Sequence, residues 1–234
     1  MEKVVFLFGR KPGLGVDEFR RHYLEVHAPL ALRSMQGLHR YVVNLPAPDS
    51  DPDPDTEAPF DAVTELTVDS AAGLFDPRRA FISDAAATQV LNDHASFLGT
   101  MHAYRVTERV VKDYDRTWPE GERSPGVKYV SLMQRAPGLS PEEFDAYWRD
   151  RHTPIALAHH GGMWKYVHNV VREPMTPDAP PLDGMVEMHF PTVDDFRERF
   201  FTPPESMALV LEDAYRFMDR STLGYPVGEY VQRG

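Results

Sequence analysis

Two histidines occupy matched positions in the two halves of the sequence. His27 follows the aromatic residue Tyr23 by four residues. His152 follows Trp148 at the same spacing, and both histidines come before an X-Pro step. Imidazole titrates near neutral pH, so it can donate or accept a proton without a cofactor. Since the residue before a proline disfavours helix, we expect each histidine to lie near a helix break where a pocket opens, unless it is a core histidine that satisfies a backbone carbonyl.

Polar residues on the expected strands form a second group of candidates. Glu65 and Glu187 either orient a histidine and bind a polar substrate group, or form cross-strand ion pairs and line a polar interior. Asn44 and Asn169 end their expected strands, so they are turn residues or hydrogen-bond donors to a substrate.

Aromatic and basic residues complete the candidate site. Aromatic side chains, Phe19 among them, would shape an apolar wall, and Arg10 or Arg135 would hold an anionic group. The predicted substrate-binding residues are Tyr23, Trp148, Tyr41, Tyr166, Asn44, Asn169, Glu65, Glu187, His168, His189, Arg10 and Arg135.

The second half is rich in histidine, which raises the question of a metal site. His152, His159, His160, His168 and His189 all lie there, whereas the first half has Val43 and Thr67 opposite the last two. A site inherited by duplication should show its ligands twice, and no H-E-x-x-H motif is present. We therefore expect no bound metal and no tightly held cofactor.

The same difference between the halves predicts that only one pocket carries out a reaction. His168 or His189 would place a second imidazole beside His152, which favours the second half, because neighbouring titratable groups tend to acquire different pKa values. Against this, Tyr23 can donate or accept a proton where Trp148 only donates a hydrogen bond.

These candidates are positioned by a repeat. The segment Arg10 to Leu14 (RKPGL) returns as Arg135 to Leu139 (RAPGL), and 125 positions separate the two phenylalanines and the two histidines that follow. Matches continue in the same order to the end of each half. The chain therefore contains one unit twice: residues 1–111 and 127–234, joined by a linker at 112–126.

Each unit has the pattern of strand, helix, strand, strand, helix and strand. The expected strands are residues 4–8, 38–44, 61–68 and 104–111, then 129–133, 163–170, 184–190 and 225–231. Ser70 and Thr192 are expected to cap the second helices, which end near Leu98 and Met218. Prolines at 77 and 203–204 should interrupt these helices.

The order βαββαβ is that of a ferredoxin-like unit, an antiparallel sheet with both helices on one face. Its other face needs covering, and the second copy supplies the cover. The predicted fold is therefore α+β, with two ferredoxin-like units whose sheets pack face to face as a barrel within one chain. Such an internal pseudo-dimer leaves further homo-oligomerisation open. Residues 46–59 and 173–181 are rich in Pro and acidic residues and indicate solvated loops, the first of them a flexible insertion or, alternatively, a lid.

Composition narrows the class of function. A formal net charge of −11 at pH 7 makes attraction to nucleic acid or an anionic membrane unfavourable. No apolar run reaches the length of a membrane helix or a signal peptide, so we expect a cytoplasmic protein. With 0 cysteines the chain has neither disulfides nor thiolate chemistry, and it lacks the P-loop, G-x-G-x-x-G and G-x-S-x-G motifs.

The repeated pattern resembles the EthD-like family of the dimeric α/β-barrel superfamily. The resemblance rests on F-x3-Y-x3-H-x-P-L from Phe19, then Tyr41-x2-Asn44 and Asp61-x3-Glu65, and on the second copy that begins at Phe144. It covers both halves almost end to end. It implies the barrel scaffold and leaves the reaction open, because the superfamily includes monooxygenases, isomerases, cyclases, decarboxylases and haem proteins.

We expect a small-molecule enzyme that performs acid/base chemistry on an apolar aromatic or polyketide-like substrate held between helices and sheet. The reaction would be an elimination, decarboxylation, cyclisation or isomerisation, with His27 or His152 as the catalytic residue. The alternatives are a cofactor-independent monooxygenase and a non-catalytic protein that binds a small ligand.

Overall fold

The computed structural model describes residues 1–47, 58–114, 116–222 and 224–234. The first half forms β1 (Glu2–Arg10), α1 (Val16–His22), the π-helical turn η1 (Tyr23–His27), α2 (Ala28–Ser34), β2 (Leu38–Pro46), β3 (Ala62–Val68), the 3-10 turn η3 (Ala72–Phe75), α3 (Pro77–Ala80), α4 (Asp84–Phe97) and β4 (Leu98–Lys112). The second half forms β5 (Val127–Met133), α5 (Pro141–Tyr147), the π-helical turn η4 (Trp148–His152), α6 (Thr153–His159), β6 (Lys165–Pro174), β7 (Gly184–Phe190), α7 (Val193–Arg199), α8 (Ser206–Ala214) and β8 (Gly224–Arg233).

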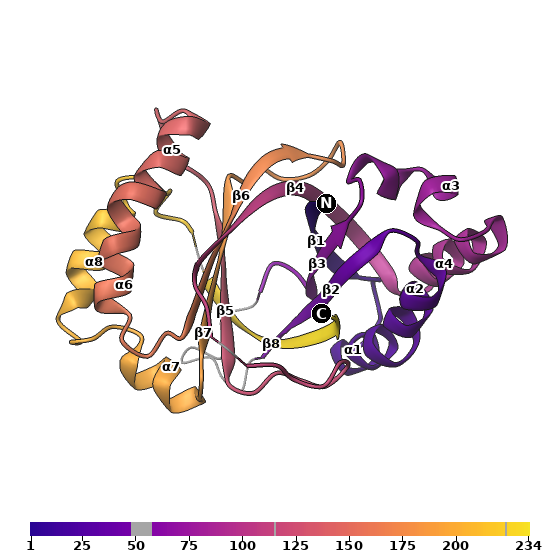
Figure 1. Cartoon of the computed structure of the whole chain (residues 1–234), viewed down its shortest axis with the longest axis horizontal. Coiled ribbons are helices and arrows are strands. Elements are labelled where there is room, and N and C mark those ends of the chain that lie inside the picture. Colours follow the sequence, from indigo (N-terminus) through magenta and orange to yellow (C-terminus); the bar gives the residue numbers. More distant parts are fainter. Residues whose placement is uncertain (48–57, 115, 223) are drawn as a thin grey trace.

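Eight antiparallel strands close into one barrel in the order β1-β3-β2-β8-β5-β7-β6-β4. Two seams join the halves, because β2 pairs with β8 and β4 pairs with β6. The helices of the first half cover one side of the barrel and those of the second half cover the opposite side (Figure 1). Among the described residues, closure gives each barrel strand a hydrogen-bonded neighbour on both sides. The structure thus confirms an α+β fold built on an antiparallel barrel within one chain.

The strands extend beyond their expected ends. β2 continues to Pro46 and β6 to Pro174, so Asn44 and Asn169 lie inside strands. The interpretation of these asparagines as turn residues is therefore wrong. Pairing with the other half is the physical reason, since Asn44 lies opposite Glu229 and Asn169 lies opposite Glu108. Neither partner strand is apparent from the local sequence around an asparagine.

The helix caps agree with expectation in the second half and differ in the first. The Thr192 side chain accepts a hydrogen bond from the backbone N–H of Asp195, as expected, and Ser140 and Glu143 form a capping box at α5. The expectation for Ser70 is wrong, because it begins only a short 3-10 turn. The long helix α4 starts later and is capped by Ser83. Pro77 begins α3, and the prolines at 203–204 separate α7 from α8.

Side chains alternate between the helix-covered face and the interior of the barrel. On β1, Val4, Phe6 and Phe8 join the first helix layer. Val5 and Leu7 point the other way, into a separate apolar cluster with residues of the second half such as Val130. Successive side chains of a β-strand point to opposite faces of the sheet, so the direction alternates with a period of two residues. In the described residues the barrel therefore separates a core under the helices of each half from a core inside it, and a further small cluster lies among α2, α3 and α4.

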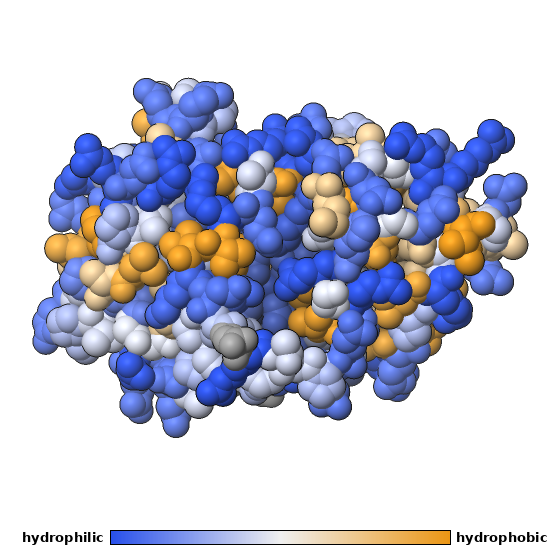
Figure 2. Space-filling view, in the orientation of Figure 1, coloured by the Kyte–Doolittle hydropathy of each residue, from blue (hydrophilic) through white to orange (hydrophobic). Residues whose placement is uncertain are grey.

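The surface is mostly polar. Figure 2 shows a largely hydrophilic face on which hydrophobic areas are broken up by polar side chains. In the described part of the chain, no helix combines the length and the apolar character needed to cross a membrane. The acidic loop expected at 46–59 falls mainly on residues 48–57, which lie outside the described residues.

Candidate active site

A π-helical turn places each candidate histidine. In the first half the backbone N–H of Ala28 donates to the carbonyl of Tyr23, five residues earlier, and the chain continues directly into α2. The expected helix break before Pro29 is therefore wrong. The wider turn accommodates a proline, which has no N–H and would clash with the carbonyl four residues before it. The second half has the same π-helical turn, which begins at Trp148 and leads into the helix that contains Pro154.

His27 is held by a carboxylate from the second helix of its half. Its Nδ1 lies 2.7 Å from Oδ2 of Asp93 on α4, and the ring is buried. Asp93 also binds Nε2 of His22 at 2.8 Å. Burial alone raises the pKa of Asp93, but the hydrogen bonds from His27 and His22 outweigh burial and lower it. The ionised Asp93 binds Nδ1 of His27, which leaves Nε2 to exchange a proton with a ligand.

The second half contains the same pair. His152 Nδ1 lies 2.8 Å from Oδ2 of Asp213, and Tyr147 donates to the other oxygen at 2.8 Å. Burial lowers the pKa of His152, although Asp213 partly opposes the shift. Sequence reasoning missed both aspartates. A signal was present, since Leu-x-Asp-x3-Phe occurs at Leu91 and again 120 positions later at Leu211.

The first-half histidine lines an apolar cavity of about 220 Å³ between the barrel and the helices. Its lining is Phe6, Phe8, Tyr23, His27, Ala31, Met35, Tyr41, Thr64, Leu66, Leu74, Phe75, Pro77, Ala80, Phe81, Val90, Leu91, His94 and Met101. We call it the first pocket. Phe75 and Leu91 are 43% and 50% exposed, so this apolar space opens to solvent beside them.

Buried hydroxyl groups form part of the wall of the first pocket. Tyr23 and Thr64 share a hydrogen bond of 2.7 Å, and the Tyr41 hydroxyl donates to that of Tyr23 at 3.5 Å. Burial raises the pKa of Tyr23 to about 12. Burial also raises the pKa of Tyr41 well above its ordinary value. Both phenols therefore stay protonated and remain hydrogen-bond donors at neutral pH.

The second pocket is smaller, about 140 Å³, and different in polarity. Its lining includes His152, Trp148 and Tyr166, and the Trp148 indole N–H donates to the Tyr166 hydroxyl at 3.1 Å. Val186 stands where the first half has Thr64. One polar residue of this lining, His160, donates a hydrogen bond from Nδ1 to the carbonyl of Phe200. Burial lowers the pKa of His160 to about 4.

His168 does not line the second pocket in the structure. It stacks on Trp148 with ring centroids 3.9 Å apart and accepts a hydrogen bond from Arg109 at 3.3 Å. Burial lowers its pKa to about 3. The first pocket, by contrast, holds a second imidazole that sequence reasoning missed: His94, with its ring centroid 4.8 Å from that of His27. The position matching His94 in the second half is Ala214.

The predicted strand residues meet inside the barrel, away from both pockets. Lys128 lies 2.6 Å from Glu65 and 2.7 Å from Glu187, while Lys3 lies 2.7 Å from Glu65. The two asparagines donate to these glutamates, at 2.9 Å in the first half and 2.5 Å in the second. The carboxylates thus form a buried ion-pair network across the barrel.

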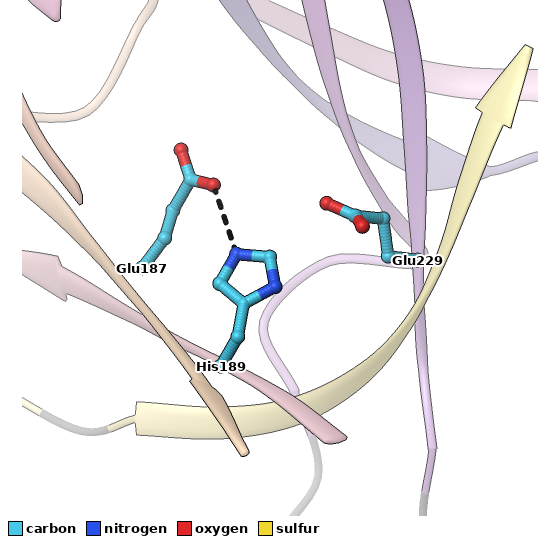
Figure 3. Close-up of side chains that lie close together, drawn as sticks. All are labelled: Glu187, His189 and Glu229. Carbon is cyan, nitrogen blue, oxygen red and sulfur yellow. Dashed lines mark ion pairs between the residues drawn. The ribbon is translucent and has the colours of Figure 1, made fainter. Parts of the chain in front are cut away.

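His189 faces the same network. Figure 3 shows Glu187, His189 and Glu229 converging from β7 and β8, with His189 Nε2 3.7 Å from a Glu187 oxygen. Their ligand atoms lie within 4.8 Å of one another, which is close enough for a metal ion. However, Lys128 already lies 3.2 Å from Glu229 and supplies a positive charge there. The arrangement therefore fits an ion-pair network better than a metal centre.

The two candidate arginines bind carboxylates of their own half. Arg10 forms an ion pair with Asp61 and its backbone N–H donates to the same carboxylate at 2.7 Å. Arg135 binds Asp183 in the same way, with a backbone hydrogen bond of 2.8 Å. Neither arginine lines the first or the second pocket.

The fold is shared with several solved structures. Over 99% of this chain and 93% of the other, it is similar to an anthrone oxidase-like protein, with a TM-score of 0.63 and 9% identity. Similarity to a candidate monooxygenase from Fusobacterium nucleatum covers 99% and 92%, with a TM-score of 0.57 and 9% identity. A candidate monooxygenase from Lactobacillus acidophilus gives a TM-score of 0.54 at 9% identity over 99% and 96%. Identities this low show a common fold alone.

The sequence itself matches a family model twice. A comparison with curated proteins finds no significant match. The model of the EthD domain matches residues 11–100 and again residues 136–221, which together are more than half of the chain. Each match contains one histidine–aspartate pair and its pocket-lining helices. The chain therefore belongs to the EthD domain family and carries the domain twice.

Proposed function

We propose that this protein is a small-molecule enzyme that carries out acid/base chemistry in the first pocket. The observation that carries the proposal is the His27–Asp93 pair of 2.7 Å at the wall of an apolar cavity. A carboxylate that orients an imidazole is a recurrent means of preparing it to move a proton. The reaction class is elimination, decarboxylation, cyclisation or isomerisation, and the mechanism uses no tightly held cofactor.

The lining of the first pocket supports an apolar aromatic or polyketide-like substrate. Phe6 and Phe8 lie nearly parallel, with an interplanar angle of 6°, and offer flat apolar surface. The hydroxyls of Tyr23 and Tyr41 can donate to an oxygen of the substrate. Arg10 is engaged by Asp61 outside the pocket, so it is not assigned to an anionic group of the substrate.

The geometry favours the first half over the second as the working site. The first pocket is larger, and its second imidazole, His94, is not bonded to the protein in the described residues, whereas His160 of the second pocket is bonded to the Phe200 carbonyl. Tyr23 and Thr64 give the first pocket hydroxyls at the positions of Trp148 and Val186 in the second half. We assign His152 to the smaller site, where it is held by Asp213 beside Trp148 and Tyr166.

Turnover measurements test the proposal. A panel of aromatic ketones and phenols is incubated with the protein, with His27→Gln and with His152→Gln, and products are identified by mass spectrometry. We expect conversion that depends on His27, without consumption of oxygen. Conversion lost only in His152→Gln would assign the reaction to the second pocket.

The same assay distinguishes the alternatives. A cofactor-independent monooxygenase would consume oxygen in proportion to product, and anthrone is a suitable probe because one similar structure is that of an anthrone oxidase-like protein. A non-catalytic binding protein would be stabilised against heat by a ligand that it leaves unchanged.

The division of the chain belongs to the same proposal. We assign residues 1–111 and 127–234 to two ferredoxin-like units with 112–126 as the linker. The strand order supports this, because β4-β1-β3-β2 in the first half has the same form as β8-β5-β7-β6 in the second. In solution we expect an internal pseudo-dimer with a small-molecule substrate as its partner.

A further inference from the structure

His94 is a half-buried polar side chain of the first pocket. It follows Asp93 on α4 and lines the cavity. Its ring packs against His27 at an angle of 43°. Within the described ranges it makes no hydrogen bond to the protein, so both ring nitrogens are available to a ligand.

The two imidazoles of this pocket have different surroundings. Nδ1 of His27 is held by the carboxylate of Asp93, so only its Nε2 is left to meet a ligand. His94 has no carboxylate bonded to it, and burial together with the charge of His27 lowers its pKa to about 4. His94 is therefore neutral at neutral pH and can accept a proton, while Nε2 of His27 is left to exchange one with the substrate.

The second pocket lacks this combination. The pairs Asp93/Asp213 and Phe97/Phe217 are 120 positions apart, and the same spacing takes His94 to Ala214. Ala214 lines the second pocket and is buried. The histidine–aspartate pair is thus common to both halves, whereas the second imidazole at this position belongs to the first half alone.

We propose that His94 is a second catalytic residue of the first pocket, the base that removes a proton from a carbon next to a carbonyl group of the substrate. The C–H bond breaks, its proton moves to a ring nitrogen of His94, and the electron pair forms the C=C bond of an enol. The carbonyl oxygen takes the Nε2 proton of a protonated His27, whose Nδ1 stays hydrogen-bonded to Asp93, so the His27 ring is left neutral. When the enol returns to the ketone, His94 gives the proton back to the same carbon or to another carbon. The sequence moves only protons, so no oxidant or reductant is needed. This inference rests on the proposed function and names the group that begins the reaction.

Hydrogen exchange of 2-tetralone, a bicyclic ketone, tests the step directly. The protein is incubated with 2-tetralone in heavy water, and deuterium entry beside the carbonyl is followed by proton NMR, with exchange in buffer subtracted. The variants are His94→Gln and His27→Gln, because glutamine keeps hydrogen-bonding capacity but cannot take up a proton. His39→Gln is the matched control, since His39 is an exposed imidazole bonded to Asp69 outside the pocket. Circular dichroism verifies that each variant is folded.

We expect the wild-type protein and His39→Gln to accelerate exchange equally, and His94→Gln to lose about a hundredfold of the maximal rate. The half-saturation concentration of 2-tetralone should change little, because a structural role would raise it instead. If His94→Gln keeps the wild-type rate while His27→Gln loses it, His94 is not the base and the proposed function stands. If the wild-type protein gives no acceleration, the acid/base function fails and the role of His94 fails with it.

Discussion

Lys128 of the second half and Glu65 of the first form an ion pair inside the barrel, with 2.6 Å between Nζ and Oε1. Lys3 makes the reciprocal contact, 3.4 Å from Glu187 of the second half. Both lysines and both glutamates are buried. Each half thus supplies a lysine that pairs with the glutamates of both halves, and the interior of the barrel depends on both halves.

The first prediction follows from this reciprocity. Lys128→Met removes the positive charge shared by Glu65, Glu187 and Glu229, and leaves buried carboxylates without their main partner. Breaking a buried ion pair typically costs about 3–5 kcal/mol. We expect a loss of that size in the free energy of unfolding, measured with urea. Lys165→Met is the control, because Lys165 pairs with the more exposed Asp113 and should change stability by less than about 1 kcal/mol. Equal losses of stability in the two variants would contradict the conclusion that the buried ion pairs of Lys128 stabilise the barrel.

The second prediction concerns acid stability. Burial alone raises the pKa of Glu229, but Lys128 and His189 outweigh it and lower the pKa from 4.5 to about 2. A lowered carboxyl pKa stabilises the fold above the unfolded value, and this contribution is lost as the pH falls. Melting temperatures should therefore decrease between about pH 4.5 and about pH 2. In Glu229→Gln the melting temperature should decrease less over this pH range. If it decreases as much as in the wild-type protein, Glu229 does not contribute to the loss of stability in acid.

The third prediction separates the two histidine–aspartate pairs. Asp93→Asn keeps the shape of the side chain but no longer fixes the proton on Nδ1 of His27, so we expect the exchange rate of 2-tetralone to fall about a hundredfold or more. Asp213→Asn makes the same change beside His152 and should leave the rate within about twofold. Comparable losses in both variants would mean that both pockets work.

The fourth prediction concerns metal content. The sequence predicts no metal because the histidines of the second half have few counterparts in the first. The structure adds that Lys128 pairs with both Glu187 and Glu229, and that His189 lies 3.7 Å from Glu187. Elemental analysis of the purified protein should find no stoichiometric transition metal, and its absorption spectrum should show no Soret band. One iron or zinc per chain would contradict this.

The repeat made most of the fold predictable from sequence. Strand and helix order follow from hydrophobic patterning, and β7 begins and ends where expected. The start of α4 was not predictable from Ser70, because Ser83 is an equally good cap and packing on the barrel decides between them. Asn44 was misinterpreted for a similar reason, since its strand is prolonged by pairing with β8.

The candidate site was less predictable. His27 is identifiable from its spacing, yet its partner Asp93 lies 66 positions away on another helix. His94 carries no repeated signal, because its counterpart is Ala214. Matching positions in the two copies identifies residues that both copies have, so it does not identify His94, which only the first copy has. Only the packing of α4 against the π-helical turn brings it beside His27.

The fusion of both halves in one chain has an evolutionary consequence. A barrel assembled from two identical subunits must carry every substitution twice, so a change useful in one cavity is imposed on the other. Here the gene encodes each cavity separately, and the seams β2–β8 and β4–β6 keep the copies together while they diverge. One cavity can keep a histidine at position 94 while the other holds an alanine at 214. One cavity can therefore become specialised without imposing the same residues on the other cavity.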